Sequence, residues 1–136
     1  MKKLLVLLTF TLLSQLSFAH ELVFSQNNVV AQTRWEKSPK AGAESVMLIQ
    51  FYDARTHEAI EPSSTLSVVL WMKDMNHGSG PTAVERVLDQ DSEVVNGLMR
   101  VRNMWFVMSG NWEIRVSLKS GTQIETQTFS ENVSHR

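Results

Sequence analysis

The chain has 136 residues, of which 13 are lysine or arginine, 14 are aspartate or glutamate and none is cysteine. This length allows one domain, and 43% hydrophobic with 20% charged residues is a globular composition. The near-neutral balance offers no basic surface for nucleic acid, and the lack of cysteine excludes disulfides, thiolate metal sites and a cysteine nucleophile.

The start of the chain has the pattern of a secretory signal peptide. Two lysines precede the apolar stretch 4–13, which is too short for a membrane span of about 20 residues. Residues 17–19 (SFA) place small side chains where a signal peptidase requires them. We therefore predict a signal peptide at residues 1–19 and a mature domain at residues 20–136, exported to a bacterial periplasm or secreted. The alternative is that the segment is kept as an anchor.

The mature chain reads as short stretches of β-branched and aromatic residues between turn residues. Strands are predicted at residues 22–25, 29–35, 45–52, 66–72, 83–88, 98–106, 112–118 and 122–129. The stretch 45–52 is apolar almost throughout, which predicts a strand covered on both faces, whereas 122–129 reads as an edge strand. No stretch outside the leader has helical periodicity. The pattern predicts an all-β, immunoglobulin-like antiparallel β-sandwich of about seven strands.

Alternation along the strands also predicts the core. In 98–106 it places Met104 on the same face as Leu98, Arg100 and Arg102, opposite Val101. Ten side chains are predicted to fill the core: Val46, Leu48, Phe51, Val68, Leu70, Val101, Phe106, Trp112, Ile114 and Val116.

The most informative segment is 71–81 (WMKDMNHGSGP). In it a predicted strand ends at Met72, and a glycine-rich loop that carries Met75 and His77 follows. Thioether and imidazole groups are a soft and borderline donor set that suits copper. The spacing lets a loop bring Met75 and His77 to one ion. The alternatives are that Met72 packs in the core and that His77 is a solvated loop residue.

Two further donors lie elsewhere in the chain. Met108 precedes a Ser-Gly turn at a strand end, so it can meet Met75 and His77 across two loops at one end of a sandwich. Cleavage after Ala19 would make His20 the first residue, whose α-amine and ring Nδ1 can chelate Cu(II). The remaining histidines, His57 and His135, are expected to be exposed.

Catalytic patterns are missing from the sequence. It contains no Gly-x-Ser-x-Gly, no His-Glu-x-x-His and no glycine-rich phosphate loop. Asp74 lies near His77, but no activated nucleophile accompanies them. We therefore predict a protein that is not an enzyme.

Two motifs resemble those of the YtkA-like and FixH-like families. These are Met-x-x-Met-x-His-Gly at residues 72–78 and Phe-x-Met-x-Gly-x-Trp-Glu at residues 106–113. The resemblance spans roughly 45–129 and implies an extracytoplasmic immunoglobulin-like domain, and for the FixH-like branch a link to copper handling or oxidase assembly. Ser109 stands where these families usually have proline. A looser likeness to CopC-type copper carriers rests on His20 and the predicted architecture.

The leading hypothesis is an exported copper carrier or buffer. Its predicted ligands are His77, Met75 and Met108, helped by Met72 or His20, and its partner is a copper ion. The alternative is a metal-free interaction domain, in which methionines with Trp71 and Trp105 form an apolar patch that docks a periplasmic or membrane protein.

Overall fold

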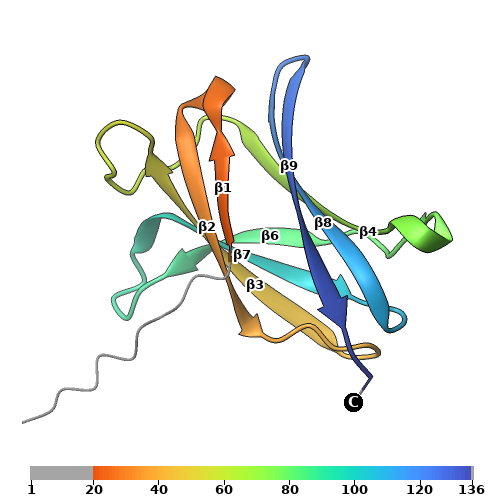
Figure 1. Cartoon of the computed structure of the whole chain (residues 1–136). Coiled ribbons are helices and arrows are strands. Elements are labelled where there is room, and N and C mark those ends of the chain that lie inside the picture. The colour runs from red at the N-terminus through yellow and green to blue at the C-terminus, as the bar shows by residue number, and fades with distance from the viewer. Residues whose placement is uncertain (1–19, 136) are drawn as a thin grey trace, which may run out of the picture.

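The computed structural model describes residues 20–135, which form β strands joined by short turns (Figure 1). The predicted signal peptide at 1–19 lies outside the described residues. Within the described range no helix has the length and hydropathy of a membrane span. The strands are β1 (His20–Phe24), β2 (Val29–Lys37), β3 (Glu44–Asp53), β4 (Thr65–Met72), β5 (His77–Gly78), β6 (Ala83–Leu88), β7 (Val94–Trp105), β8 (Gly110–Ser120) and β9 (Gln123–Val133).

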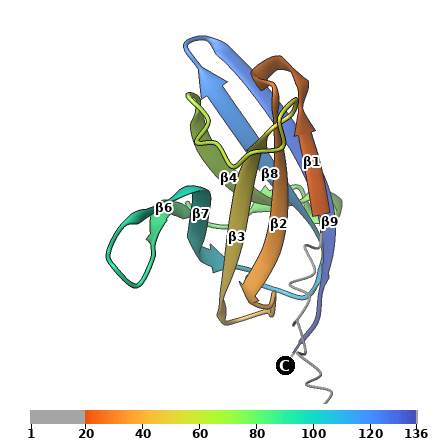
Figure 2. The ribbon, with the colours of Figure 1, turned by 90° about the vertical axis from the view of Figure 1, so that its left-hand side faces the viewer.

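The strands form two antiparallel sheets that face each other. One sheet has the order β1-β2-β3-β7-β6, and the other has the order β5-β4-β8-β9. Two short 3-10 turns, η1 (Ser25–Asn27) and η2 (Lys73–Met75), interrupt the chain after β1 and β4. The edge strands β1 and β9 lie close together on one side of the sandwich, and the β6–β7 hairpin stands away from the other side (Figure 2). The predicted all-β sandwich is confirmed.

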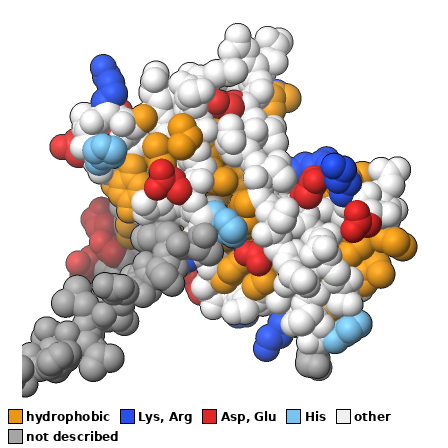
Figure 3. Space-filling view, in the orientation of Figure 1, with side chains coloured by type: hydrophobic (Ala, Val, Ile, Leu, Met, Phe, Trp, Pro, Cys, Tyr) orange, Lys and Arg blue, Asp and Glu red, His pale blue; other side chains and the backbone are white. Residues whose placement is uncertain are grey.

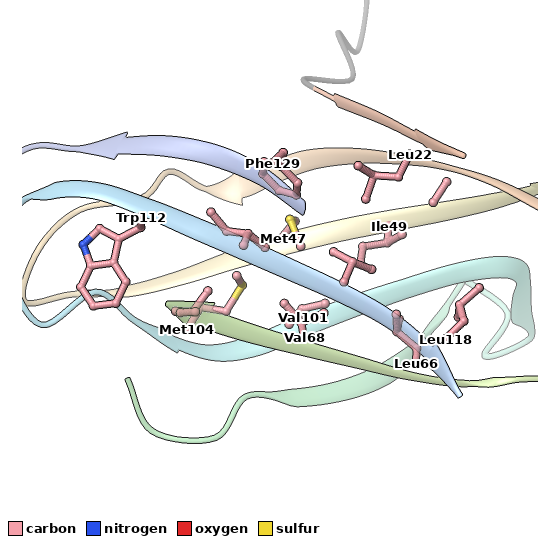
Figure 4. Packing of buried hydrophobic residues seen from close by; sticks show 14 of the residues in the cluster. Leu22, Met47, Ile49, Leu66, Val68, Val101, Met104, Trp112, Leu118 and Phe129 are labelled. Atoms are coloured by element: carbon pink, nitrogen blue, oxygen red, sulfur yellow. The ribbon is translucent and has the colours of Figure 1, made fainter. Parts of the chain in front are cut away.

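Buried side chains between the sheets form one core (Figure 4). All ten predicted core residues are buried, and eight of them belong to this cluster. Val46 and Leu48 are buried on the other face of β3, because the residues that alternate with them, Met47 and Ile49, point into the core. Leu48 shares its outer groove with Val87 and Leu98. The prediction that this strand is covered on both faces is therefore confirmed.

The sequence placed the side chain of Met104 on the wrong face of β7. Met104 is fully buried and packs with Val101 in the core, not on the face of Leu98 and Arg100. The register with β3 shifts by one residue between the pairs Met47↔Val101 and Ser45↔Met104. Asn103 takes a φ of 59° at this β-bulge, which turns the following side chain to the opposite face.

Strand β9 is an edge strand, as predicted, but it buries a carboxylate that alternation alone would not identify. Ile124 is 58% exposed, whereas Glu125 is only 8% exposed and faces the η1 turn of the opposite sheet. Its Oε1 accepts a hydrogen bond from Asn27 Nδ2 at 2.9 Å, and its Oε2 accepts bonds from Gln26 N at 3.2 Å and Ser25 Oγ at 3.4 Å. Glu125 therefore ties the two sheets together.

The same contacts set the charge state of this carboxylate. Burial alone would raise the pKa of Glu125, but the hydrogen bonds from Asn27, Gln26 and Ser25 outweigh it and lower the pKa below the ordinary value of 4.5. A lowered pKa in the folded state stabilises the fold above the unfolded pKa, and this contribution is lost as the pH falls through the folded pKa.

Replacing Glu125 with glutamine is expected to reduce the free energy of unfolding by about 1–3 kcal/mol near neutral pH, because buried donors lose a charged acceptor. The difference from wild type should shrink as the pH falls below 4.5. Urea unfolding at neutral and acidic pH measures this, with Glu21→Gln on the exposed face of β1 as the control. A difference that stays constant across the pH range would contradict the assignment.

Candidate functional site

The Met/His loop begins where β4 ends at Met72. The chain makes the η2 turn, and Asn76 adopts a left-handed φ of 48° that reverses its direction. The short strand β5 then returns along β4, with His77 opposite Met72 and Gly78 opposite Trp71. A side chain at position 78 would lie 2.9 Å from the Leu70 carbonyl oxygen and 3.1 Å from the Trp71 ring. Glycine is therefore required for this close return, which fixes the position of His77.

His77 is half-buried and its ring points toward β8. The ring meets the indole of Trp112 edge-on, with 5.9 Å between the ring centroids and 79° between the planes. Nδ1 of His77 lies 3.4 Å from the Gly78 carbonyl oxygen. His77 is thus held against the core instead of extending into solvent as a free loop side chain.

Trp112 connects this loop to the β7–β8 corner, residues 106–109. Its side chain is fully buried, and its Nε1–H donates a hydrogen bond to the Met108 carbonyl oxygen at 3.0 Å. Its ring also meets Phe106 edge-on, with 5.4 Å between centroids. The loop that carries His77 and the corner that carries Met108 therefore meet at one end of the sandwich, with one indole as their common contact.

The three candidate methionines differ in exposure. Met75 in η2 is 56% exposed and Met108 is 37% exposed, so both thioethers reach solvent. Met72 is only 3% exposed, and its methyl group lies 2.9 Å from the place that a side chain at Gly110 would occupy. Met72 is therefore part of the core that supports the corner.

The side chain of His20 contacts strand β9. Its ring stacks on Phe129 with 4.2 Å between centroids, and its Nε2 lies 3.3 Å from Glu131 Oε1. The same oxygen accepts a hydrogen bond from Trp35 Nε1 at 2.9 Å. None of the described contacts of His20 involves Met75, His77 or Met108.

His135 adds an imidazole to this end of the molecule that the sequence alone did not associate with it. It is exposed, as predicted, but its Nε2 lies 2.8 Å from the Oγ of Ser109, the neighbour of Met108. The cause is the β8–β9 register, in which Gly110 pairs with Val133. Such a pairing can be read from a sequence only when the length of the β8–β9 hairpin is known. His57 is also exposed, as predicted.

Exposed apolar side chains adjoin Met108 in the chain. Trp105 is 42% exposed and Val107 is 60% exposed, and both belong to or adjoin the same corner. Figure 3 shows hydrophobic side chains gathered on the right-hand side of the molecule, over η2 and the β7–β8 corner. Beneath η2 lies a groove of about 400 Å³ with charged walls, lined by Lys73, Asp74, Asn111, Trp112, Glu113 and Ser130.

The donors at this corner are soft. Among residues 20–135, no three His, Asp or Glu side chains gather into a group that could hold a metal. The candidate therefore depends on the Met75 and Met108 sulfurs with the His77 imidazole, a set whose chemistry suits Cu(I) better than Zn²⁺ or Ca²⁺. Comparison with protein-family models, curated proteins and solved structures finds no match to this chain.

Proposed function

We propose that this chain is an exported copper carrier or buffer that binds Cu(I) through Met75, Met108 and His77. The observation that carries the proposal is the contact of Trp112 with both loops, since it orients His77 and fixes the backbone of Met108. Each of these two loops carries one exposed thioether, that of Met75 or that of Met108. Met72 is buried and supports the corner in this proposal instead of binding the ion, and His20 is not included because its ring stacks on Phe129 of β9.

The donor set gives this site its chemistry. Thioethers stay neutral and do not compete for protons, and one imidazole adds a borderline nitrogen donor. A site at the surface suits a protein that must pass its ion on, because its ligands are within reach of a receiving molecule. The sandwich supplies a rigid base, since Trp112 and Met72 are both core residues.

Replacing Met75, His77 and Met108 together with alanine is expected to weaken Cu(I) binding by about 100-fold or more, because all proposed ligands are removed. Competition titration of residues 20–136 against a chromophoric Cu(I) chelator measures the affinity. Met72→Leu, which removes a buried sulfur and keeps the packing, and His57→Ala, which removes an exposed imidazole elsewhere, are the controls and should bind as wild type does. If the triple variant bound Cu(I) as tightly as wild type, these three residues would not be the ligands.

The second candidate function is a metal-free interaction domain. Trp105 and Val107 favour it, because they are exposed apolar side chains that donate nothing to a metal. In this case wild type would take up no copper above the level of the triple variant. Trp105→Ala with Val107→Ser would then abolish binding to a defined partner while leaving the fold intact.

We further propose that the chain is exported with loss of residues 1–19 and that the resemblance to YtkA-like and FixH-like domains reflects common descent. The intact mass of protein recovered from the periplasm of an expressing bacterium is expected to correspond to residues 20–136. A mass that includes residues 1–19 would favour a retained anchor and would contradict export by cleavage.

A further inference from the structure

A polar pocket lies at the opposite end of β8 from the Met/His corner. It has a volume of about 250 Å³ and is bounded by η1, the β3–β4 connection and the β8–β9 turn. Its walls carry hydroxyl and amide groups, including those of Asn27, Ser63, Ser64, Ser120 and Gln123. The buried carboxylate of Glu125 also lines it. None of these residues belongs to the proposed copper site, so the inference does not depend on that proposal.

Glu125 keeps its charge in this pocket. Its two oxygens accept hydrogen bonds from Asn27, Gln26 and Ser25, which lower its pKa. Asn27 is itself held in place, because its Oδ1 accepts a hydrogen bond from the Ser64 hydroxyl. The carboxylate is therefore both ionised and rigidly oriented.

Within residues 20–135, no ion pair joins a cationic side chain to this carboxylate. The described lining of the pocket includes no lysine, arginine or histidine. The hydrogen bonds keep the carboxylate ionised, so its negative charge remains in the pocket as an attraction for a cationic ligand. Asn27 Nδ2, Gln26 N and Ser25 Oγ donate to the two oxygens of Glu125, and a backbone hydrogen bond from Asn27 further favours the ionised form, so a ligand would meet the negative charge of this carboxylate together with the other polar groups of the lining.

We propose that this pocket binds the ammonium group of a small organic amine. A primary ammonium carries one positive charge and three N–H donors. Its charge can pair with the Glu125 carboxylate, and the hydroxyl and amide oxygens of the lining can accept its hydrogens. A divalent cation is a poorer match, because Ca²⁺ needs six or more oxygen ligands and usually several carboxylates. Here a single carboxylate is present and most of its acceptor positions are filled.

Titration of the protein with ethylammonium chloride, followed by amide chemical shifts in NMR, tests the proposal. Saturable shifts are expected at Gln26, Asn27, Ser64 and Gln123, and NaCl and CaCl₂ at equal ionic strength should not reproduce them. Glu125→Gln is expected to weaken binding at least tenfold. Glu131→Gln, which changes the other inward-facing carboxylate of β9, should bind as wild type does.

Because Glu125→Gln also removes a tie between the sheets, a second variant keeps the test independent of folding. Gln123→Arg introduces a guanidinium at the pocket wall and leaves every hydrogen bond of Glu125 in place. It is expected to abolish the ethylammonium shifts. Shifts that Na⁺ or Ca²⁺ reproduce, shifts that Gln123→Arg leaves unchanged, or no saturable shifts at all would each overturn the proposal.

Discussion

Replacing Gly97 with alanine is expected to reduce the free energy of unfolding by about 3–5 kcal/mol. Gly97 lies in β7 with a φ of 73°, a conformation that strains any residue with a side chain. A Cβ atom there would lie 2.5 Å from the Ile60 carbonyl oxygen and 2.8 Å from the Phe51 carbonyl oxygen. Both obstacles are backbone atoms, and Ile60 N donates to Phe51 O at 3.1 Å, so neither can move alone. Chemical denaturation of wild type and variant measures the loss.

Gly42→Ala is the matched control for this prediction. Gly42 has nearly the same φ, 77°, but nothing lies within 4 Å of an added Cβ. It should therefore show only the strain of the left-handed conformation, about 1–2 kcal/mol. Equal losses of unfolding free energy in the two variants would show that the close approach of β7 to the connection after β3 does not add to the loss in Gly97→Ala.

Replacing Trp112 with alanine is expected to cost about 3–5 kcal/mol of stability, because it removes the largest fully buried side chain and leaves a cavity. The variant also loses the hydrogen bond to Met108 and the edge contact with His77. If the copper proposal is right, Trp112→Phe should retain most of the stability but weaken Cu(I) binding, because the N–H that fixes Met108 is absent. Thermal unfolding and chelator competition measure the two effects separately.

Trp105→Ala is the control for the loss of an indole. Trp105 is 42% exposed, and its Nε1–H donates to the Asn103 side chain at 2.9 Å on the surface. Its removal should change stability by less than about 1 kcal/mol and leave Cu(I) affinity unchanged. A Trp112→Ala variant as stable as Trp105→Ala would contradict the central place of Trp112 in the corner.

The sequence predicted most of the fold because the strands follow a strict two-residue period. Trp112, Ile114 and Val116 alternate with polar residues and all are buried. The same rule failed at Met104, because a β-bulge inserts one residue and reverses the faces beyond it. It also gave no sign of buried Glu125, since the donors that make this burial favourable come from a turn almost a hundred residues away.

The candidate site was predictable in part. Residue types and spacing proposed Met75, His77 and Met108 as candidates, and the structure places His77 and the Met108 backbone against one indole. The sequence left the role of Met72 open, because its burial in the core depends on how the two sheets pack together. The position of His135 beside Ser109 depends on the register of β9, which residue type does not encode.

X-ray absorption spectroscopy at the copper edge, on residues 20–136 loaded with Cu(I), tests the proposed site most directly. Sulfur atoms bound to the metal are expected together with one imidazole nitrogen, and the sulfur contribution should fall when Met75 and Met108 are replaced with leucine. A spectrum that nitrogen and oxygen neighbours explain fully, or a sulfur contribution that survives both substitutions, would contradict the account.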